Sequence, residues 1–177
     1  MKNKLIITIF CIVTFILTFT LTWRTLYLHD ISLTTAVTDR VLNGQAPYKD
    51  FSTPRTPLYY YILAGWLSIF GESITAFKLF DCVVSTLAVF FFMTFIPWSN
   101  LWIAGLLSLA WSATIIESIG FQNPFAALLS LVVLWFLVRS KWFIAGIFLA
   151  ILALVKQDFA IGAMLGSIIY MAVQNEQ

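Results

Sequence analysis

Charged side chains are scarce in this sequence. They make up 10% of its 177 residues, whereas hydrophobic residues make up 61% and the mean hydropathy is +0.94. A soluble domain uses about 25% charged residues to cover its surface. The shortage therefore excludes an ordinary water-soluble domain and favours a chain surrounded by lipid.

Histidine, cysteine and basic clusters are also scarce. His29 is the single histidine, which argues against a histidine-rich metal site. Cys11 and Cys82 both lie in apolar runs, which predicts packing residues rather than a disulfide framework. The net charge of +2 comes without a basic cluster, so nothing indicates nucleic acid as a partner. No soluble domain or repeat is visible, and residues 1–177 are expected to form a single transmembrane domain.

Long runs of apolar residues make up most of the sequence. After Lys2 and Lys4, an uncharged run covers residues 5–23, which is long enough to span a bilayer. This run ends in TFTLTWR, without the small residues of a cleavage site, so a retained anchor is favoured over a signal peptide. The two lysines place its start in the cytoplasm, and the polar stretch that follows is then outside.

Six further apolar segments predict an all-α, polytopic helix bundle. They cover residues 57–70, 76–96, 101–116, 124–138, 142–155 and 159–173. Seven crossings would put the basic turn at residues 139–141 outside, against the positive-inside bias. Segment 57–70 is short and rich in tyrosine, which is typical of an interfacial helix. We therefore prefer six spanning helices with both termini cytoplasmic, and seven crossings remain the alternative.

Residues 24–75 form the largest predicted outer loop. Asp30 is a good N-cap for a helix in this loop, and Asn43-Gly44 is a good stop. The loosely helical spacing of apolar residues suggests that this helix lies along the membrane. The proline-rich stretch that follows is irregular, and Pro57 suits the first turn of the next helix.

Polar side chains gather at the predicted outer face. They are His29, Asp30, Asp50, Arg55, Lys156, Gln157 and Asp158. A carboxylate at headgroup level can act as a general base towards a hydroxyl, and a nearby cation can hold a phosphate. The set suits a reaction whose leaving group is a lipid phosphate in the outer leaflet.

Each of these residues also has a structural interpretation. Asp30 can be a helix cap alone, and Arg55 can simply contact lipid phosphates, as cations beside membranes often do. Lys78 and Asp81 lie one turn apart in a predicted span and can pair with each other. The chemistry of the loop by itself leaves these alternatives open.

The order of these features resembles a known family. A spanning helix is followed by the early outer Asp30, then NGQAPYKDF, then the aromatic segment PLYYYILAGWLSIFGES, and later AGIFLAILALVKQD. This order is similar to the N-terminal module of the GT-C superfamily of integral membrane glycosyltransferases. The nearest members are rhizobial lipopolysaccharide galacturonosyltransferases, aminoarabinose transferases and protein O-mannosyltransferases. The resemblance covers nearly the whole chain.

The resemblance implies transfer of a hexosyl or pentosyl group from a polyprenyl-phosphate donor to an acceptor at the outer face. Asp30 would be the catalytic base. The implied substrate-binding residues are Tyr48, Asp50, Arg55, Lys156 and Gln157. The lipid-linked sugar is a substrate rather than a cofactor, and a divalent metal is left open. The implied location is the plasma membrane, with a bacterial inner membrane preferred.

Three features depart from the family pattern. Asp30-Ile31 stands where an Asp-Glu pair is common, and Asn123 precedes Pro124 where an acid is usual. The chain is also shorter than family members, which predicts an incomplete N-terminal part whose missing spans another chain could supply.

Other functions stay open at this stage. The chain could be a non-catalytic accessory protein that binds a lipid-linked sugar, or an inactive truncated fragment. A small transporter is disfavoured, because transporters hold polar residues near the bilayer midplane and tend to show repeats.

Overall fold

The computed structural model describes residues 2–24, 28–53, 55–115 and 122–174. Side chains are described within these ranges except at residues 2, 3, 23, 24, 28–31, 98, 111–115 and 174. Helices make up 84% of the described residues, and no strand occurs among them. The all-α prediction is therefore confirmed.

The helices follow one another with short connections. They are α1 (Lys2–Arg24), α2 (Leu28–Leu42), α3 (Leu58–Phe70), α4 (Ile74–Phe95), α5 (Leu101–Ile115), α6 (Asn123–Val138), α7 (Trp142–Val155) and α8 (Gln157–Gln174). A 3-10 turn, Trp98–Asn100, leads into α5. Seven of these helices match the apolar segments of the sequence in order, and α2 is the helix expected within the outer loop.

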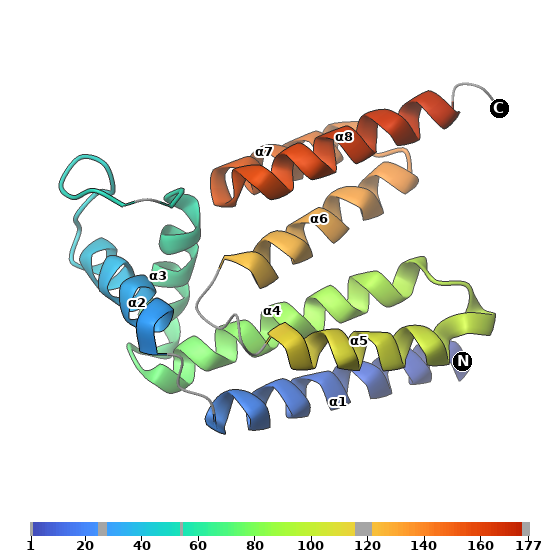
Figure 1. Cartoon of the computed structure of the whole chain (residues 1–177), viewed down its shortest axis with the longest axis horizontal. Helices are drawn as coiled ribbons and strands as arrows, with labels where there is room; N and C mark the ends of the chain where they lie inside the picture. Colours follow the sequence, from blue (N-terminus) through green and yellow to red (C-terminus); the bar gives the residue numbers. More distant parts are fainter. Residues whose placement is uncertain (1, 25–27, 54, 116–121, 175–177) are drawn as a thin grey trace.

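Helices α1 and α4 to α8 run roughly side by side, and α2 and α3 lie across one end of them (Figure 1). Helix α4 is central, because it packs against α1, α5, α6 and α3. Helices α7 and α8 pack on α6. Both chain termini lie at the end opposite to α2 and α3 (Figure 1). The polar loop is thus gathered at one end of an apolar bundle.

The ends of α2, α3 and α4 follow local sequence signals. Gly44, with φ of 79°, follows the end of α2 as predicted, and Gly71, with φ of 89°, follows α3. Both angles lie in the left-handed region that glycine adopts without steric cost. Ser73 caps α4, because its hydroxyl accepts a hydrogen bond from the backbone N–H of Ala76 at 3.1 Å.

The prediction that Asp30 caps α2 is wrong. The helix begins at Leu28, two residues earlier, so Asp30 lies within its first turn. Leu28 and His29 have no helix-breaking chemistry, and the first turn therefore extends upstream of the best capping residue. The side chain of Asp30 lies outside the described part of the chain.

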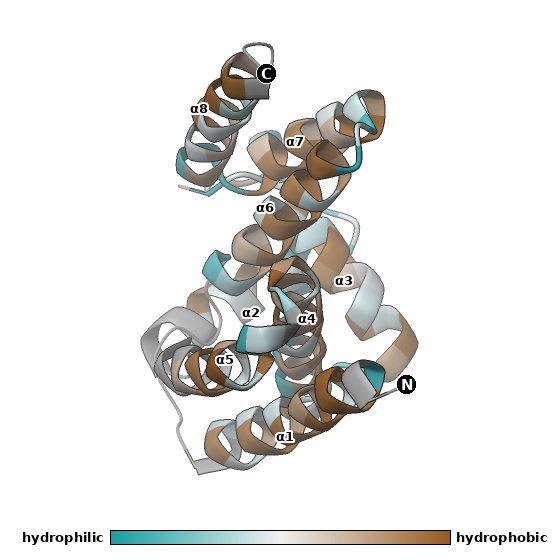
Figure 2. Cartoon of the chain, turned by 90° about the vertical axis from the view of Figure 1, so that its right-hand side faces the viewer, coloured by the Kyte–Doolittle hydropathy of each residue, from teal (hydrophilic) through white to brown (hydrophobic). Residues whose placement is uncertain are grey.

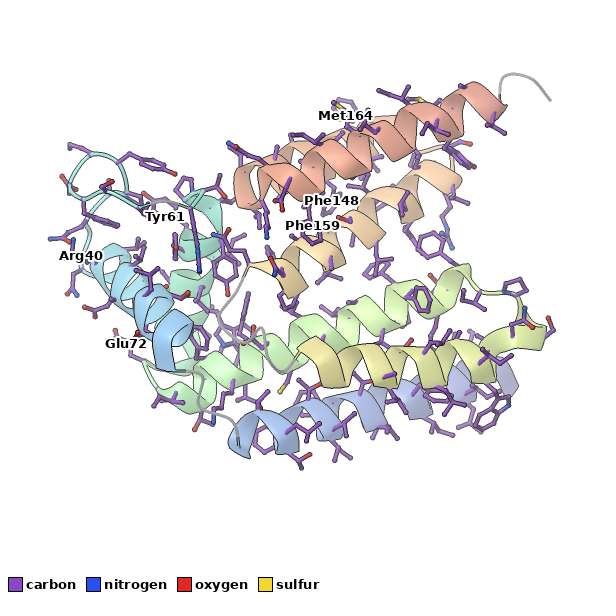
Figure 3. The ribbon with its side chains drawn as sticks, viewed as in Figure 1. Arg40, Tyr61, Glu72, Phe148, Phe159 and Met164 are labelled. Atoms are coloured by element: carbon purple, nitrogen blue, oxygen red, sulfur yellow. The ribbon has the colours of Figure 1, made fainter. Side chains whose placement is uncertain are left out.

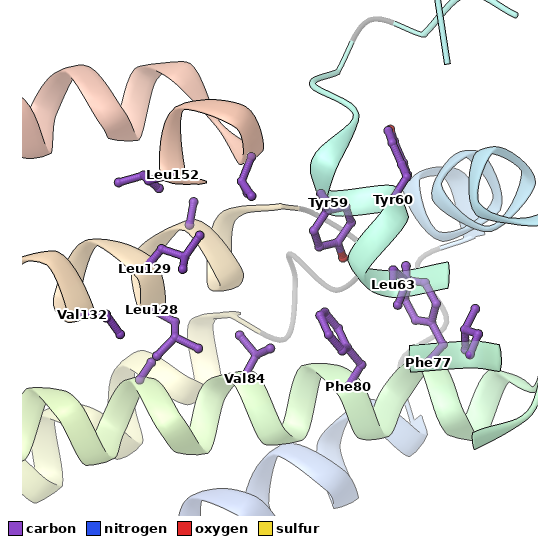
Figure 4. Close-up of a cluster of buried hydrophobic side chains, with 14 of the residues drawn as sticks. Tyr59, Tyr60, Leu63, Phe77, Phe80, Val84, Leu128, Leu129, Val132 and Leu152 are labelled. Atoms are coloured by element: carbon purple, nitrogen blue, oxygen red, sulfur yellow. The ribbon is translucent and has the colours of Figure 1, made fainter. Parts of the chain in front are cut away.

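The main core lies where α3 meets α4, α6 and α7. It includes Tyr59, Tyr60, Leu63, Phe77, Phe80, Val84, Leu128, Leu129 and Leu152 (Figure 4). Tyr59 and Tyr60 are 1% and 0% exposed, whereas Tyr61 is 47% exposed. The exposure of Tyr61 alone is compatible with a tyrosine at headgroup level. Tyr59 packs its ring against Phe80 of α4 and Phe125 of α6, with centroids 6.3 and 6.2 Å apart, and Tyr60 is buried beside Tyr59. These contacts anchor α3 across the end of the bundle.

Within the described part of the chain, two helices are long and apolar enough to cross a membrane: Lys4–Thr22 within α1, and α4. Helices α5, α6 and α7 have 15, 16 and 14 residues, about 21–24 Å at 1.5 Å per residue. A bilayer core is about 30 Å thick. The layout with six spanning helices therefore stays a prediction.

Large apolar side chains are exposed on α1, α5, α7 and α8, and hydrophobic residues recur along α1 and α8 in the colouring of Figure 2. Trp102, Ile103, Leu106 and Leu107 of α5 are each about 60% exposed, and Phe143 of α7 is 82% exposed. Water-soluble monomers rarely expose apolar surface on this scale.

A second, smaller cluster joins α1 to α5 and α4. The ring of Phe10 is 5% exposed and packs edge-on against Trp102, with ring centroids 5.7 Å apart. A Cβ at Gly105 would lie 2.3 Å from this ring, so a side chain at this position must displace the Phe10 ring from between α1 and α5.

We expect Gly105→Ala to lower the thermal midpoint of the detergent-solubilised protein, because the added methyl group must displace the buried Phe10 ring. Gly65→Ala in α3 is the matched control, since its Cβ would meet nothing within 4 Å. There the gain in helix propensity, about 1 kcal/mol, should leave the midpoint unchanged or higher. Equal midpoints for the two variants would contradict the packing of α1 on α5.

Candidate functional site

A polar cavity of about 530 Å³ lies where the loop before α3 meets the starts of α6 and α8. It is lined by Arg55, Thr56, Gln122, Asn123, Lys156, Gln157 and Asp158. These residues come from three parts of the sequence that are far apart. The fold therefore creates this cavity, and no single segment does.

Lys156 reaches the cavity because it is the one residue between α7 and α8. Its backbone is extended, with φ of −158°. Its N–H donates to the carbonyl of Leu152 at 2.7 Å, and its own carbonyl accepts from the N–H of Ala160 at 3.2 Å. The residue thus completes the last turn of one helix and opens the first turn of the next.

The ammonium group of Lys156 has three neighbours. It donates a hydrogen bond to the side-chain oxygen of Asn123, lies 3.5 Å from a carboxylate oxygen of Asp158, and lies 5.1 Å from the ring centroid of Phe159. The Lys156 side chain is 26% exposed and that of Asp158 is 67% exposed. Water screens the exposed carboxylate, so its ion pair with Lys156 is weak.

Arg55 is held by the loop that carries it. Its guanidinium donates to the hydroxyl of Thr34 on α2 at 3.3 Å, and its carbonyl accepts from the hydroxyl of Tyr48 at 2.8 Å. The neighbouring Thr56 donates through its hydroxyl to the carbonyl of Val155, and Gln122 donates to the carbonyl of Thr56 at 3.3 Å. These bonds fix the loop between α2, α6 and α7.

The cavity favours an anion. Arg55 and Lys156 contribute two positive charges and Asp158 one negative charge, so the formal charge of the lining is +1. Helices α6 and α8 both begin at the lining residues, at Asn123 and Gln157. The N-terminus of a helix carries partial positive charge and free N–H groups, which favour phosphate and similar anions.

Tyr59 lies close enough to Arg55 to feel its charge. Burial raises the pKa of Tyr59 well above its usual value, as do Asp81 and Tyr60, whereas Arg55 lowers it. The phenol is therefore neutral at physiological pH and does not act as a counter-ion for Arg55.

The structure brings together four of the residues that the sequence singles out, namely Arg55, Lys156, Gln157 and Asp158. Tyr48 supports Arg55 through the bond described above and does not line the cavity. Asp50 does not line it either, because its carboxylate accepts the N–H of Ala46 at 2.7 Å and closes a local turn.

The structure describes the backbone of Asp30 but not its side chain. Its backbone lies on α2, one turn before Thr34, the residue that accepts the hydrogen bond from Arg55. Glu117, the acid nearest to the Asn123-Pro124 pair in the sequence, also lies outside the described residues.

Sequence reasoning missed three lining residues: Thr56, Gln122 and Asn123. The available signal was the Asn-Pro start of α6, where the sequence lacks the acid usual in the resembled family. A neutral amide at Asn123 can bond Lys156 without cancelling its charge. This departure leaves the cavity more positive than a carboxylate would.

An apolar groove of about 630 Å³ runs beside the cavity, between α4 and α5 on one side and α6 and α8 on the other. From α8 it is lined by Phe159, Gly162, Ala163 and Gly166, which share one helical face. Nothing lies within 4 Å of a Cβ built at either glycine. The GxxxG pattern of α8 therefore opens space rather than closing a helix contact within this chain.

Phe159 joins the cavity to the groove. It lies in the first turn of α8 (Figure 3), contacts the ammonium of Lys156 through its ring, and lines the groove. On α6, Asn123 lines the cavity and Ala127, one turn further, lines the groove. Polar and apolar recognition surfaces thus adjoin along the same two helices.

Comparisons with protein-family models, with curated proteins and with solved structures return no match.

We expect Asn123→Asp to weaken binding of an anionic lipid phosphate, used as a probe, by about three- to tenfold at low salt, because the new carboxylate would neutralise Lys156. Asp158→Asn, which is also close to isosteric, removes a negative charge and should strengthen binding. The measurement is a titration of each variant with the same lipid in detergent. Changes of the same sign in both variants would contradict an anion site.

Proposed function

We propose that this chain is a membrane glycosyltransferase, alone or as the N-terminal catalytic part of a larger assembly. It transfers a sugar from a polyprenyl-phosphate-linked donor to an acceptor at the outer face of the membrane. The observation that carries the proposal is that Arg55 and Lys156, from distant parts of the sequence, line one cavity beside an apolar groove.

The cavity suits the phosphate of the donor. When the bond between the sugar and the phosphate oxygen breaks, the electron pair stays on the phosphate, and negative charge grows there. Cations and helix N-termini already aimed at that position stabilise the developing charge without reorganising. Arg55 has a planar guanidinium that can bind two phosphate oxygens at once, while Lys156 offers a point charge.

The groove suits the prenyl chain of the donor. Its α6 wall runs from Ala127 to Leu134, about 10 Å along the helix at 1.5 Å per residue. Its lining is almost wholly apolar, with small residues where a chain could lie close to the backbone. A lipid whose phosphate sits beside Lys156 would pass Phe159 and enter the groove directly.

Asp30 is the proposed base. In the proposed reaction, its carboxylate takes the proton of the acceptor hydroxyl, the hydroxyl oxygen bonds to the sugar carbon, and the lipid phosphate leaves with inversion. The position of Asp30 on α2, one turn before the Thr34 that bonds Arg55, supports this role. A positioned base of this kind contributes about 10²–10⁴-fold in rate.

The proposed setting is a bacterial plasma membrane, with α2 and α3 at the outer face and both termini in the cytoplasm. Both termini lie at one end of the bundle together with the α6–α7 turn (Figure 1). That turn carries Arg139 and Lys141, which favours a cytoplasmic location for this end. The apolar exposure of α5, α7 and α8 supports lipid contact along these shorter helices as well.

A second function is favoured by one observation. Among the described residues, Asp158 is the one carboxylate that lines the cavity, and it already contacts Lys156. A chain that binds the lipid-linked sugar without catalysing its transfer, as an accessory protein, would need nothing more. The role of Asp30 therefore separates the two functions.

We expect Asp30→Asn to abolish sugar transfer and leave donor binding largely intact, because asparagine keeps the size of the side chain and removes the proton acceptor. Arg55→Ala should instead weaken donor binding. Arg40→Ala is its matched control, since Arg40 is an exposed α2 cation whose guanidinium carbon lies 5.2 Å from the ring centroid of Phe51, outside the cavity.

The assay uses the chain in proteoliposomes with any partner required for turnover, and it measures transfer and donor affinity separately. Full transfer by Asp30→Asn in an active assembly would reject Asp30 as the base and leave the accessory function. Unchanged donor affinity in Arg55→Ala would reject both functions.

We expect Gly166→Leu to reduce affinity for a long-chain donor and to leave affinity for a short-chain analogue unchanged, because leucine would fill the groove without touching the cavity. Gly146→Leu on α7 also has open space around it and does not line the groove, so it controls for added bulk. Equal losses for long and short donors would contradict the groove as the site of the prenyl chain.

A further inference from the structure

A row of threonines on α1 is completely buried. Thr14, Thr18 and Thr22 are 0%, 2% and 0% exposed, and they recur every four residues, so they lie along one side of the helix. Ile12 and Ile16 of the same helix are 54% and 55% exposed. The polar side of α1 therefore faces the bundle, and an apolar side faces outward.

Two contacts show which part of α4 this row faces. Phe10, one turn before the first threonine, packs with Val89 and Met93. At the other end of the row, the hydroxyl of Thr22 lies within hydrogen-bond reach of the thiol of Cys82. Because α1 and α4 pack directly on each other (Figure 1), the stretch of α4 between Cys82 and Val89 lies opposite the middle of the row.

That stretch of α4 contains one buried polar residue, Ser85, which is 1% exposed. Lys78 and Asp81 precede it by seven and four residues, so the three side chains share one side of α4. Lys78 and Asp81 are 5% and 4% exposed. Hydroxyl groups of both helices thus meet inside the bundle, beside one buried charge of each sign.

Other helical hydroxyls of the described chain bond the backbone of their own helix. Thr20 donates to the carbonyl of Ile16 at 2.9 Å, and Thr86 donates to the carbonyl of Cys82 at 2.7 Å. This bond to the preceding turn is ordinary for serine and threonine in helices. The same bond is made by Thr8, Thr38, Ser108, Ser130 and Ser167.

Thr14, Thr18 and Ser85 depart from this geometry. Their hydroxyl oxygens are fully buried and form no hydrogen bond with any group in the described part of the chain. A buried hydroxyl without a partner is destabilising, and native structures pair such groups with protein or with water. Three of them at one helix interface indicate a partner that the interface itself binds.

The neighbouring charges determine which kind of molecule fits. Lys78 and Asp81 both already interact within the chain, and their opposite charges leave no net formal charge here. An added cation would be repelled by Lys78, and an added anion by Asp81. A neutral molecule that both donates and accepts hydrogen bonds suits the hydroxyls. They line neither the polar cavity nor the apolar groove, which favours the smallest such molecule, water.

We propose that α1 and α4 enclose internal water molecules that bridge the hydroxyls of Thr14 and Thr18 to that of Ser85. Buried waters typically make about three hydrogen bonds to polar groups of this kind. Towards the N-terminus of α1, the apolar cluster of Phe10 and Val89 closes the site. The inference does not rest on the proposed glycosyl transfer, because the three hydroxyls belong to neither site described above.

Bridging water would fasten α1 to α4. Apolar helix surfaces gain little by leaving lipid, so packing and hydrogen bonds between helices determine whether they associate in a membrane. Helix α1 makes its contacts with α4 and α5, and its threonine row is its buried polar surface. Water at this row would supply the hydrogen bonds that the side chains do not make directly.

The direct test is NMR transfer of magnetisation from water to threonine methyl groups. The full chain is deuterated except at these methyls and reconstituted in lipid bilayers. We expect transfer to Thr14 and Thr18 that is much weaker at Thr86, which follows Ser85 at the same depth but bonds its own helix. Absence of transfer at Thr14 and Thr18, or equal transfer at Thr86, would overturn the proposal.

A valine substitution tests the sign of the hydroxyl's effect on stability. Thr18→Val keeps the shape of the side chain, and we expect it to lower the thermal midpoint by about 2–4 °C, because the bonds to water are lost. In a dry interface the same change would remove an unpaired hydroxyl and raise the midpoint. Thr20→Val makes the same change on the exposed side of α1 and is the matched control. A midpoint for Thr18→Val equal to or above that of the control would contradict bridging water.

Two variants read by NMR show whether the water joins the two helices. Thr18→Val should reduce transfer from water to the Thr14 methyl, which a loss of packing alone would not do. Ser85→Ala removes the hydroxyl of α4 and should reduce transfer to Thr18. Transfer that stays at the wild-type level in both variants would reject a bridge between α1 and α4.

Discussion

The break between α7 and α8 at Lys156 is the constraint on which the polar end of the molecule depends. One extended residue reverses the chain, and its backbone groups serve the last turn of α7 and the first turn of α8. Because the turn consists of a single residue, the Lys156 side chain lies next to the start of α6, where the side-chain oxygen of Asn123 accepts its hydrogen bond. Thr56 bonds the carbonyl of Val155, which ties the Arg55 loop to the same point.

Scarcity of charge elsewhere gives this end its significance. Most side chains of the bundle are apolar, both in its core and on its surface. Helix α4 contacts its neighbours mainly through apolar side chains, and this packing supports the polar end of the molecule. Lys78, Asp81 and Ser85 are buried polar residues of α4 and depart from this pattern. Because Arg55 and Thr56 lie just before α3, the anchoring of Tyr59 and Tyr60 in the core sets the position of the loop that lines the cavity. A change in that anchor would reach the Arg55 loop.

Apolar runs and helix-ending residues in the sequence predict most of the helices, including the end of α2 at Asn43-Gly44. The meeting of Arg55 with Lys156 and Gln157 was also predictable, because all three lie at junctions assigned to the same end. Burial of Tyr59 and Tyr60 was not, since composition cannot tell a tyrosine at the headgroups from one facing a core. Asn123 was missed because the sequence showed only that this position lacks an acid, and the amide was not considered as a hydrogen-bond partner for Lys156. Number and direction of crossings, and the place of the Asp30 side chain, stay predictions.

The central claim is that Arg55 and Lys156 hold the phosphate of a lipid. Solid-state NMR on the membrane-reconstituted chain, with labelled lysine and arginine nitrogens, measures their distances to the phosphorus of bound polyprenyl phosphate. Our account predicts coupling to the Nζ of Lys156 and to the guanidinium of Arg55, at about 4 Å, as expected for charge-assisted hydrogen bonds. Phosphorus that couples instead to Lys49 or Arg40, or to neither cavity cation while the lipid is bound, would contradict it.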